Sequence, residues 1–442
     1  MAYGLDSLSA VKLRGLGSPE DRGRVGSIYN SDDVSHPSRQ HPKNIPFLGI
    51  YFTEGLFDWA VRVLGAGLLG TKPCLVPRNG DTKPNNLSFH SILLEQTNMK
   101  YVQLGTSGLR IAPIGVGCMS FGNPDGRYKW SIPEEEALPV LNHCYESGLN
   151  FFDTANAYSS GISEEILGKA IKKYNWRREN LVIATKLWAP VGRGLEQPMA
   201  MTDDEKDNSG YVNQYGLSRK HIFESIDASL KRLDLPYVDL LQIHRFDPRT
   251  PVKETMEALH DIVKSGKVRY IGASSMWAHQ LLEYQYTARI HGWTEFISMQ
   301  NLHNATYREE EREMYPACAK FGMGGIPWSP VAMGFLARPW RDFSTTTRGE
   351  GQGQGFYGLS TTEADKNVNE QVEKIAKQHG VSMATVAIAW SLSKPFITAP
   401  ILGMSKKERV DEAVRAISFE LTPEELKSID DLYVPKNVIG HK

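Results

Sequence analysis

Short apolar runs alternate eight times with longer amphipathic segments between residues 114 and 402, and this alternation strongly constrains the fold. The runs have the length of buried strands, and the segments between them have the apolar spacing of helices. Strands that alternate with helices along a chain form parallel sheets. Because eight such units follow one another, the pattern predicts an α/β fold, a closed (β/α)8 TIM barrel rather than an open sheet.

The predicted elements have the following bounds. The eight strands are Ile114–Gly117, Asn150–Phe152, Leu181–Thr185, Val238–Ile243, Val268–Gly272, Phe296–Met299, Gly324–Pro327 and Ile397–Leu402. The helices are Pro133–Ser147, Ser163–Lys173, Ser218–Leu233, Pro251–Ser265, Met276–His291, Glu309–Phe321, Ala364–His379 with Met383–Ser391, and one that begins near Ser405. An N-terminal hairpin over 101–111 and a short outer helix over Thr422–Leu432 complete the prediction.

Two connections are too long to be simple linkers. Trp188–Gly216 follows the third strand and Ser329–Glu363 follows the seventh, and both are rich in glycine and polar residues. Insertions after the carboxyl ends of strands usually cover a binding site. We therefore expect these two loops to act as lids and to select the substrate.

Residues 1–98 differ in texture from residues 99–442, which form the predicted barrel domain. They are rich in Gly, Ser, Pro, Asp and Arg without periodicity, and we expect an irregular or disordered extension. Within it, GLDSLSAVKLR resembles the attachment motif of acyl carrier proteins, with Ser7 at the attachment position. The helix that should precede this motif is absent, so a fusion remnant or a misjudged gene start explains it better. It weakly hints at polyketide synthesis.

Composition excludes several classes of partner. The formal net charge of −1 gives no reason to expect nucleic acid or an anionic membrane. The four cysteines lack any CxxC or zinc spacing, which argues against disulfides and a bound metal. The most apolar early run, Ala60–Gly70, is too short to span a bilayer. These features predict a cytoplasmic protein, and they carry no information on its oligomeric state.

Ionisable residues stand where the second and third predicted strands end. Asp153 closes one apolar run, Tyr158 follows across a small polar loop, and Lys186 closes the next run. All strand ends of a barrel face one mouth, so these three side chains can meet there. A tyrosine has a reference pKa of about 10, and a neighbouring cation favours phenolate. The trio predicts a proton donor aimed at a polarised oxygen such as a carbonyl.

The later strand ends are polar as well. His244 closes the fourth run, Ser274 and Ser275 follow the fifth, Gln300 the sixth, and Trp328 the seventh. A single histidine is more often structural than catalytic. An apolar barrel top has no need of a polar ring, however, and the repetition favours a functional site.

Seven segments resemble the aldo-keto reductase superfamily in their order and spacing: FFDTANAY, IATK, LLQIHRFD, YIGASS, MQN, PWSPVAMGFL and ILGMSKKERVDEA. The resemblance covers residues 100–434, and details such as LARPWRD are closest to fungal aryl-alcohol dehydrogenases and versiconal hemiacetal acetate reductases. It implies reduction of an aldehyde or ketone to an alcohol by NADP(H), and by its fungal character a place in secondary metabolism.

The resemblance also implies a role for each matching residue. Tyr158 would be the general acid, Lys186 bonded to Asp153 would lower its pKa, and His244 would orient the substrate carbonyl. The residues implied to hold the cofactor are Asp153, Ser274, Ser275, Gln300, Trp328, Ser329, Pro330, Val331, Ala332, Met333, Gly334, Gly403, Ser405, Lys406, Arg409 and Glu412. Ser275 and Ala413 depart from the family's usual residues. The cations near the last helix favour NADPH over NADH.

Two other readings use the same barrel. A non-catalytic NADPH-binding regulatory protein would lack a histidine at the position of His244, and an aldolase would use Lys186 to form a Schiff base. Neither explains the whole set of residues as well as a reductase does. Met119, Phe121, Trp130 and Trp188 suggest that the substrate is an aromatic or hydrophobic carbonyl compound.

Overall fold

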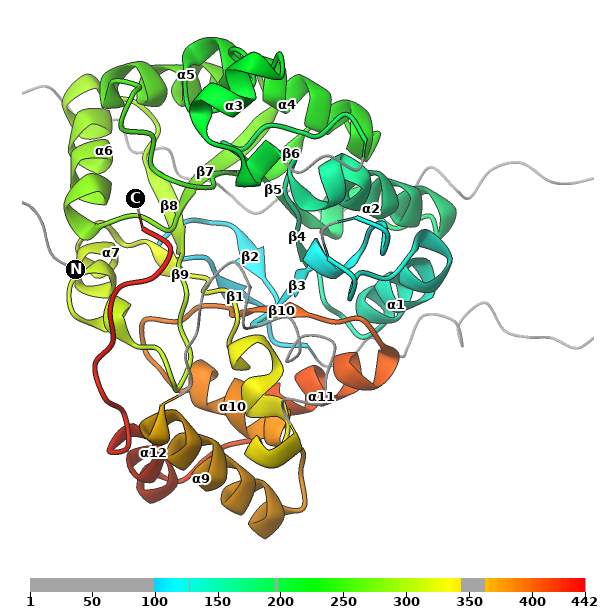
Figure 1. Ribbon diagram of the computed structural model, residues 1–442, viewed down its shortest axis with the longest axis vertical. Helices are drawn as coiled ribbons and strands as arrows, with labels where there is room; N and C mark the ends of the chain where they lie inside the picture. The colour runs from blue at the N-terminus through cyan, green and yellow to red at the C-terminus, as the bar shows by residue number, and fades with distance from the viewer. Residues whose placement is uncertain (1–98, 127, 195–197, 343–361, 442) are drawn as a thin grey trace, which may run out of the picture. The chain divides into compact units, whose positions relative to one another are not determined.

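Eight parallel strands form the centre of the protein, as the computed structural model of the chain shows (Figure 1). It describes residues 99–441 except 127, 195–197 and 343–361. The sheet order is β10-β3-β4-β5-β6-β7-β8-β9. Parallel bridges between Gly325 and Ile397 and between Trp328 and Ile401 join its two edges. The predicted (β/α)8 barrel is therefore confirmed, whereas the predicted extension over 1–98, Ser7 and Ala60–Gly70 lie outside the described residues.

The barrel strands are β3 (Gly115–Gly117), β4 (Phe151–Asp153), β5 (Val182–Leu187), β6 (Val238–Ile243), β7 (Val268–Ser274), β8 (Phe296–Gln300), β9 (Gly324–Gly325) and β10 (Ile401–Gly403). The helices are α1 (Glu134–Glu146), α2 (Ile162–Lys173), α3 (Asp203–Asn208), α4 (Arg219–Leu233), α5 (Val252–Lys264), α6 (Ala278–His291), α7 (Met314–Phe321), α9 (Glu363–His379), α10 (Met383–Leu392), α11 (Lys407–Ile417) and α12 (Pro423–Asp430). In Figure 1, α9 and α12 lie outside α10.

Three predicted bounds were wrong. The strands β9 and β10 are shorter than predicted because Pro327 and Pro400 have no N–H to give to a ladder. The predicted helix 309–321 is a 3-10 turn, Glu309–Glu311, followed by α7. The carboxylates of this turn bond to residues far away in the chain, such as Tyr433, and these tertiary contacts interrupt the helix.

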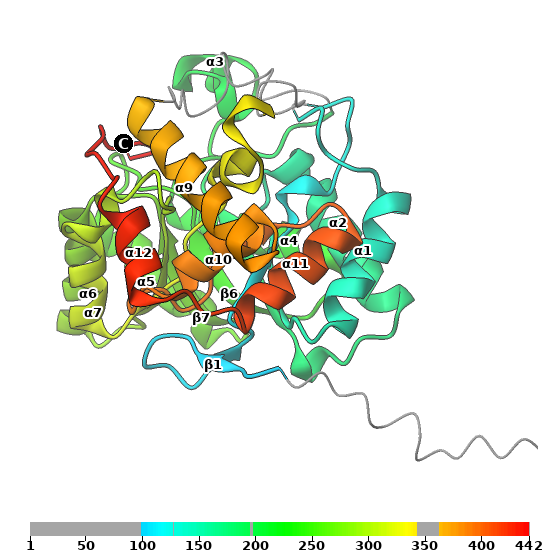
Figure 2. The same ribbon diagram turned by 90° about the horizontal axis from the view of Figure 1, so that it is seen from below.

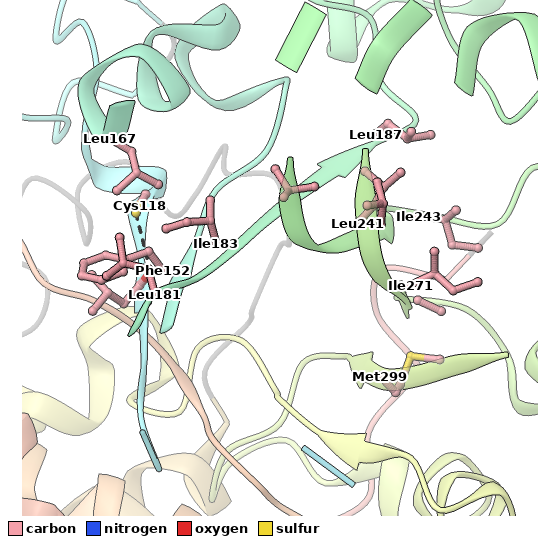
Figure 3. Packing of buried hydrophobic residues seen from close by; sticks show 14 of the residues in the cluster. Cys118, Phe152, Leu167, Leu181, Ile183, Leu187, Leu241, Ile243, Ile271 and Met299 are labelled. Carbon is pink, nitrogen blue, oxygen red and sulfur yellow. Dashed lines mark hydrogen bonds between the residues drawn. The ribbon is translucent and has the colours of Figure 1, made fainter. Parts of the chain in front are cut away.

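Side chains alternate between the two faces of each strand, so the barrel wall separates two apolar layers. Outward-facing residues pack under the helices; Figure 3 shows several of them, including Phe152, Ile183 and Leu241. Inward-facing residues such as Phe151 and Leu240 fill the barrel together with Leu104 and Ile111 of the N-terminal hairpin. This hairpin, β1 (Val102–Gln103) with β2 (Arg110–Ile111), was predicted and is confirmed.

The hairpin and the long loop after β5 occupy opposite ends of the barrel. Figure 2 shows β1 at one end and α3, which belongs to the 188–216 insertion, at the other. The neck of this insertion is closed by the Gly216 amide, which donates to the Trp188 carbonyl over 2.8 Å. The hairpin therefore covers one end of the barrel, and the mouth formed by the carboxyl ends of the strands is the other end. No helix in the described part of the chain is long and apolar enough to cross a membrane.

Candidate active site

Four polar side chains point into the barrel near the carboxyl ends of their strands. Asp153 ends β4, Lys186 stands near the end of β5, Gln242 lies in β6 and Gln300 ends β8. The strand register places Lys186 opposite Gln242 and Ser274 opposite Gln300. In each strand an apolar neighbour faces outward, so the two-residue period of the strands turns the polar side chains inward. The fold thus collects residues from four strands at one level.

Lys186 is the centre of this cluster. Its Nζ donates to Asp153 Oδ2 over 2.5 Å, to the Thr154 carbonyl over 2.9 Å and to Tyr158 Oη over 3.2 Å. Burial alone would lower the pKa of Lys186, but the charges of Asp153 and Tyr158 and its bonds to both outweigh burial and raise it. Lys186 therefore stays protonated beside the Tyr158 hydroxyl. The structure brings together the trio that the sequence predicted.

His244 follows β6 and stands beside Tyr158. The two rings meet edge to face with centroids 5.9 Å apart, and the histidine is 7% exposed. Burial, followed by the positive charges of Arg245 and Lys186, lowers the pKa of His244 well below its usual value. The imidazole is therefore neutral near neutral pH, and its Nδ1 has no hydrogen-bond partner among the described residues. A neutral imidazole at this place can direct a hydrogen bond into the mouth without competing as an acid.

Two amides support Asp153 from the side opposite Lys186. Gln242 Nε2 and Gln300 Nε2 both donate to Asp153 Oδ1, over 2.8 and 2.9 Å, and Gln300 Nε2 also donates to Gln242 Oε1 over 3.1 Å. Gln242 was not predicted from the sequence. A usable signal existed, because Gln242 stands two residues before His244 in LLQIH and shares the inward face of that strand.

The serines after β7 lie next to Gln300. Ser274 Oγ donates to the Gln300 carbonyl over 2.6 Å, and the Ser275 amide donates to Asn301 Oδ1 over 2.6 Å. Ser275 has a φ of +46°, a left-handed conformation that this bond to Asn301 helps to hold. Asn301 is itself fixed by Glu310, to which it donates over 2.5 Å. Asn301 was not predicted from the sequence, because its role depends on a contact across two strands.

The segment after β9 folds into a tight loop. Trp328 is half-buried and bridges to Leu302, which follows β8, and to Ile401 of β10, and the next residues turn sharply. Positive φ angles occur at Ser329, Ala332, Met333 and Gly334. The Met333 amide donates to Ser329 Oγ over 2.8 Å, and Pro330 is buried while Val331 is half-buried. Successive amides in such a turn form a concave surface that suits an anion.

Asn369 of α9 holds the far end of this loop. Its Nδ2 donates to the carbonyls of Phe335 and Arg338, over 2.6 and 3.0 Å, and its Oδ1 accepts from the Trp340 amide over 2.8 Å. Asn369 is fully buried, so these bonds are shielded from water. The loop is therefore preorganised by a side chain that was not predicted from the sequence.

Cations gather where α11 begins. Arg409 Nη1 donates to Ser405 Oγ over 2.7 Å, and Lys406 is the N-cap residue. Desolvation, followed by the charge of Arg338, lowers the pKa of Arg409, and the charge of Glu412 acts in the opposite direction. The Arg409 residue as a whole remains exposed. Arg338 was not predicted. A bound phosphate would offset the repulsion between these two cations.

Other predicted residues follow the carboxyl ends of β3, β5 and β10. Gly403 ends β10 two residues before Ser405, Met119 follows β3, and Trp188 follows β5. Met119 and Trp188 are half-buried, as residues that line a pocket would be. Phe121, which we expected beside them, is fully buried in the outer apolar layer and was wrongly predicted to line the pocket. The donor set as a whole fits a dinucleotide.

Comparisons with known proteins agree with this geometry. The model of the Aldo/keto reductase family matches residues 113–434. The chain is 48% identical over 341 residues to the versiconal hemiacetal acetate reductase of Aspergillus parasiticus, covering 77% of this chain and 98% of the relative. An aldo-keto reductase of Fusarium vanettenii is 43% identical over 358 residues, 79% of this chain and 95% of the relative. Similarity extends to an aryl-alcohol dehydrogenase homologue of Schizosaccharomyces pombe, 44% identical over 347 residues, 77% of this chain and 97% of the relative.

Proposed function

The chain belongs to the aldo/keto reductase family, and from that premise we propose that it reduces an aldehyde or ketone to an alcohol with NADPH. The observation that carries the proposal is the contact of Tyr158, Lys186 and Asp153 beside His244. When bound, NADPH supplies the hydride. The side chains of the protein supply the proton and the orientation.

Tyr158 is the proton donor in this proposal. As the phenol gives up its proton, negative charge grows on Oη, and the Lys186 ammonium 3.2 Å away stabilises that charge. Asp153 keeps the ammonium charged and aimed at Tyr158. A Schiff-base role for Lys186 is disfavoured, because that chemistry needs a lysine with a lowered pKa and the pKa of Lys186 is raised.

His244 orients the substrate in this proposal. Its lowered pKa keeps the imidazole neutral, so it can donate one hydrogen bond to the substrate oxygen while the acid remains Tyr158. The edge-to-face contact with Tyr158 fixes the relative position of the two rings. Acid and orienting group then converge on one oxygen atom.

The cofactor is held by two groups of residues. Ser274, Ser275 and Gln300 would bind the nicotinamide carboxamide, Asp153 would border it, and Trp328 would stack on the ring. The phosphates would lie on the loop Ser329, Pro330, Val331, Ala332, Met333 and Gly334 and on Gly403, Ser405, Lys406 and Arg409, with Glu412 at the adenine. The family generally uses NAD(P)H. The cation pair Arg338 and Arg409 supports NADPH over NADH, because an added 2′-phosphate would relieve their repulsion.

The substrate is proposed to be an aromatic or otherwise hydrophobic carbonyl compound. Half-buried Met119 and Trp188 at the mouth offer apolar contacts to such a molecule. Relatives named for versiconal hemiacetal acetate and aryl alcohols support this class and a place in fungal secondary metabolism. We also propose that residues 99–442 are the catalytic domain and that the reaction takes place in the cytoplasm.

The test is NADPH oxidation, followed by absorbance, against a panel of aromatic aldehydes and ketones. We expect turnover by the wild type, and we expect Tyr158→Phe to lower kcat by about a hundredfold or more with unchanged NADPH binding. Tyr284→Phe removes the hydroxyl of a buried tyrosine outside the cluster and is the matched control. Tight NADPH binding without turnover of any carbonyl compound would refute the proposed reaction.

A further inference from the structure

Gln242 occupies a place in the barrel that is made to fit it. It is fully buried, and its neighbour in the register is Gly272. A Cβ atom on Gly272 would lie 2.4 Å from Ser298 Oγ and 3.3 Å from Gln242 Cγ. The glycine therefore leaves the room in which the Gln242 amide reaches Asp153.

Chemistry fixes the orientation of both amides. A carboxylate oxygen only accepts hydrogen bonds, so the atoms of Gln242 and Gln300 that approach Asp153 Oδ1 must be the nitrogens. The oxygen of Gln242 then faces Gln300 and accepts its second N–H over 3.1 Å. Both N–H groups of Gln300 are used inside the cluster. Only the carbonyl oxygen of Gln300 is left to meet a ligand, and it offers an acceptor.

We propose that Gln242 is a positioning residue for carbonyl reduction, acting on Gln300 and on Asp153. Through Gln300 it presents a hydrogen-bond acceptor to the carboxamide N–H₂ of the cofactor. By donating a hydrogen bond to Asp153, Gln242 offsets part of the negative charge of that carboxylate. The positive charge of Lys186 then stabilises the Tyr158 phenolate more strongly. This inference rests on the proposed function and assigns a residue that touches neither substrate nor cofactor.

The ionisable groups around Asp153 in the described part of the chain come from several strand ends. Lys186 from β5 pairs with Asp153 and contacts Tyr158 from the loop after β4, and Cys118 after β3 and His244 with Arg245 after β6 lie around them. Burial and then the charge of Asp153 raise the pKa of the Cys118 thiol well above its usual value. With the pKa of His244 lowered, both side chains are neutral near neutral pH. A substitution of Gln242 is therefore expected to affect Tyr158 through Asp153 and Lys186.

Two substitutions separate this role from packing. Gln242→Met keeps the volume and removes both hydrogen bonds. Gln242→Glu keeps the shape, and when its new carboxyl group is protonated it can donate to Asp153 and accept from Gln300 as the amide does. Gln285→Met is the matched control, because Gln285 is also fully buried and bonds to the Phe296 backbone, but on the outer side of the barrel.

The readouts are the NADPH dissociation constant, from quenching of tryptophan fluorescence, and the pH profile of kcat. For Gln242→Met we expect a dissociation constant about tenfold higher and a kcat about threefold to tenfold lower, as the loss of about one hydrogen bond at each step implies. The alkaline limb of its profile should move up by roughly half a pH unit. Gln242→Glu should approach wild-type values at low pH and lose them as pH rises.

The outcomes distinguish the inference from the function on which it rests. Absence of turnover by the wild type would refute the proposed reaction, while the binding constants would still test the Gln300 contact. An active Gln242→Met enzyme with wild-type NADPH affinity and an unmoved alkaline limb would overturn the positioning role alone. Equal effects of Gln242→Met and Gln285→Met on both readouts would also overturn it, because they would reduce Gln242 to a packing residue.

Discussion

Replacing Lys186 by methionine removes the positive charge that lies 3.2 Å from Tyr158 Oη. Two unit charges at this distance interact by about 5 kcal/mol at an effective dielectric constant near 20. The Asp153 carboxylate partly neutralises the Lys186 ammonium, and the phenol oxygen carries only a partial charge in the transition state. These two effects reduce the interaction energy to roughly half of that value. About 2.7 kcal/mol corresponds to a loss of about a hundredfold in kcat.

The Lys186→Met substitution also leaves the buried Asp153 carboxylate without its cationic partner. Breaking a buried ion pair from one side typically costs about 3–5 kcal/mol of folding free energy. Asp153 keeps its bonds from Gln242 and Gln300, so we expect a loss near the low end of that range, about 3 kcal/mol. The double variant Lys186→Met with Asp153→Asn removes the stranded charge and should recover most of the stability without recovering activity.

The assay is kcat for a carbonyl substrate at saturating NADPH, together with the urea-unfolding free energy of each variant. Lys394→Met is the matched control, because Lys394, which follows α10, is also mostly buried and pairs with Asp430 of α12 over 2.7 Å. It should lose stability and keep kcat. A folded Lys186→Met protein whose kcat lies within about threefold of wild type would refute the electrostatic reasoning, since it would imply less than about 1 kcal/mol.

Three further predictions concern the cofactor, the barrel interior and pH. Arg409→Met should raise the NADPH dissociation constant about tenfold and leave that of NADH within about twofold; equal losses would contradict a 2′-phosphate contact. Gly272→Ala should cost about 1–3 kcal/mol by overpacking, and the added change Ser298→Ala should recover part of it in thermal unfolding; no recovery would place the clash elsewhere. Burial lowers the pKa of His221 to about 4, so the unfolded state takes up a proton before the folded state as pH falls from 6.5. The free energy of unfolding should fall by about 3 kcal/mol as the pH decreases from 6.5 to about 4, and His221→Gln should reduce this fall in urea titrations. An unchanged dependence of the unfolding free energy on pH would exclude His221 as its source.

The pattern of apolar runs determined the barrel, because buried parallel strands need continuous apolar residues and amphipathic helices to cover them. It also located Asp153 and Lys186, which end such runs, and Tyr158, which follows Asp153 across a short polar loop, because strand ends meet at the mouth of a barrel. The fold class and the central trio could therefore be predicted from the sequence alone. The family resemblance then attached roles to them.

Other features depended on contacts that no local pattern encodes. The residues Gln242, Asn301, Arg338 and Asn369 act through partners brought close by strand register and loop docking, and the helix predicted over 309–321 broke because its acidic turn bonds to distant residues. The sequence by itself determined which strands form and which faces they bury, because side-chain periodicity is a local property. Only the tertiary structure decided which polar groups share a carboxylate and which cations face each other, because hydrogen bonds and charge interactions depend on distances across the closed barrel.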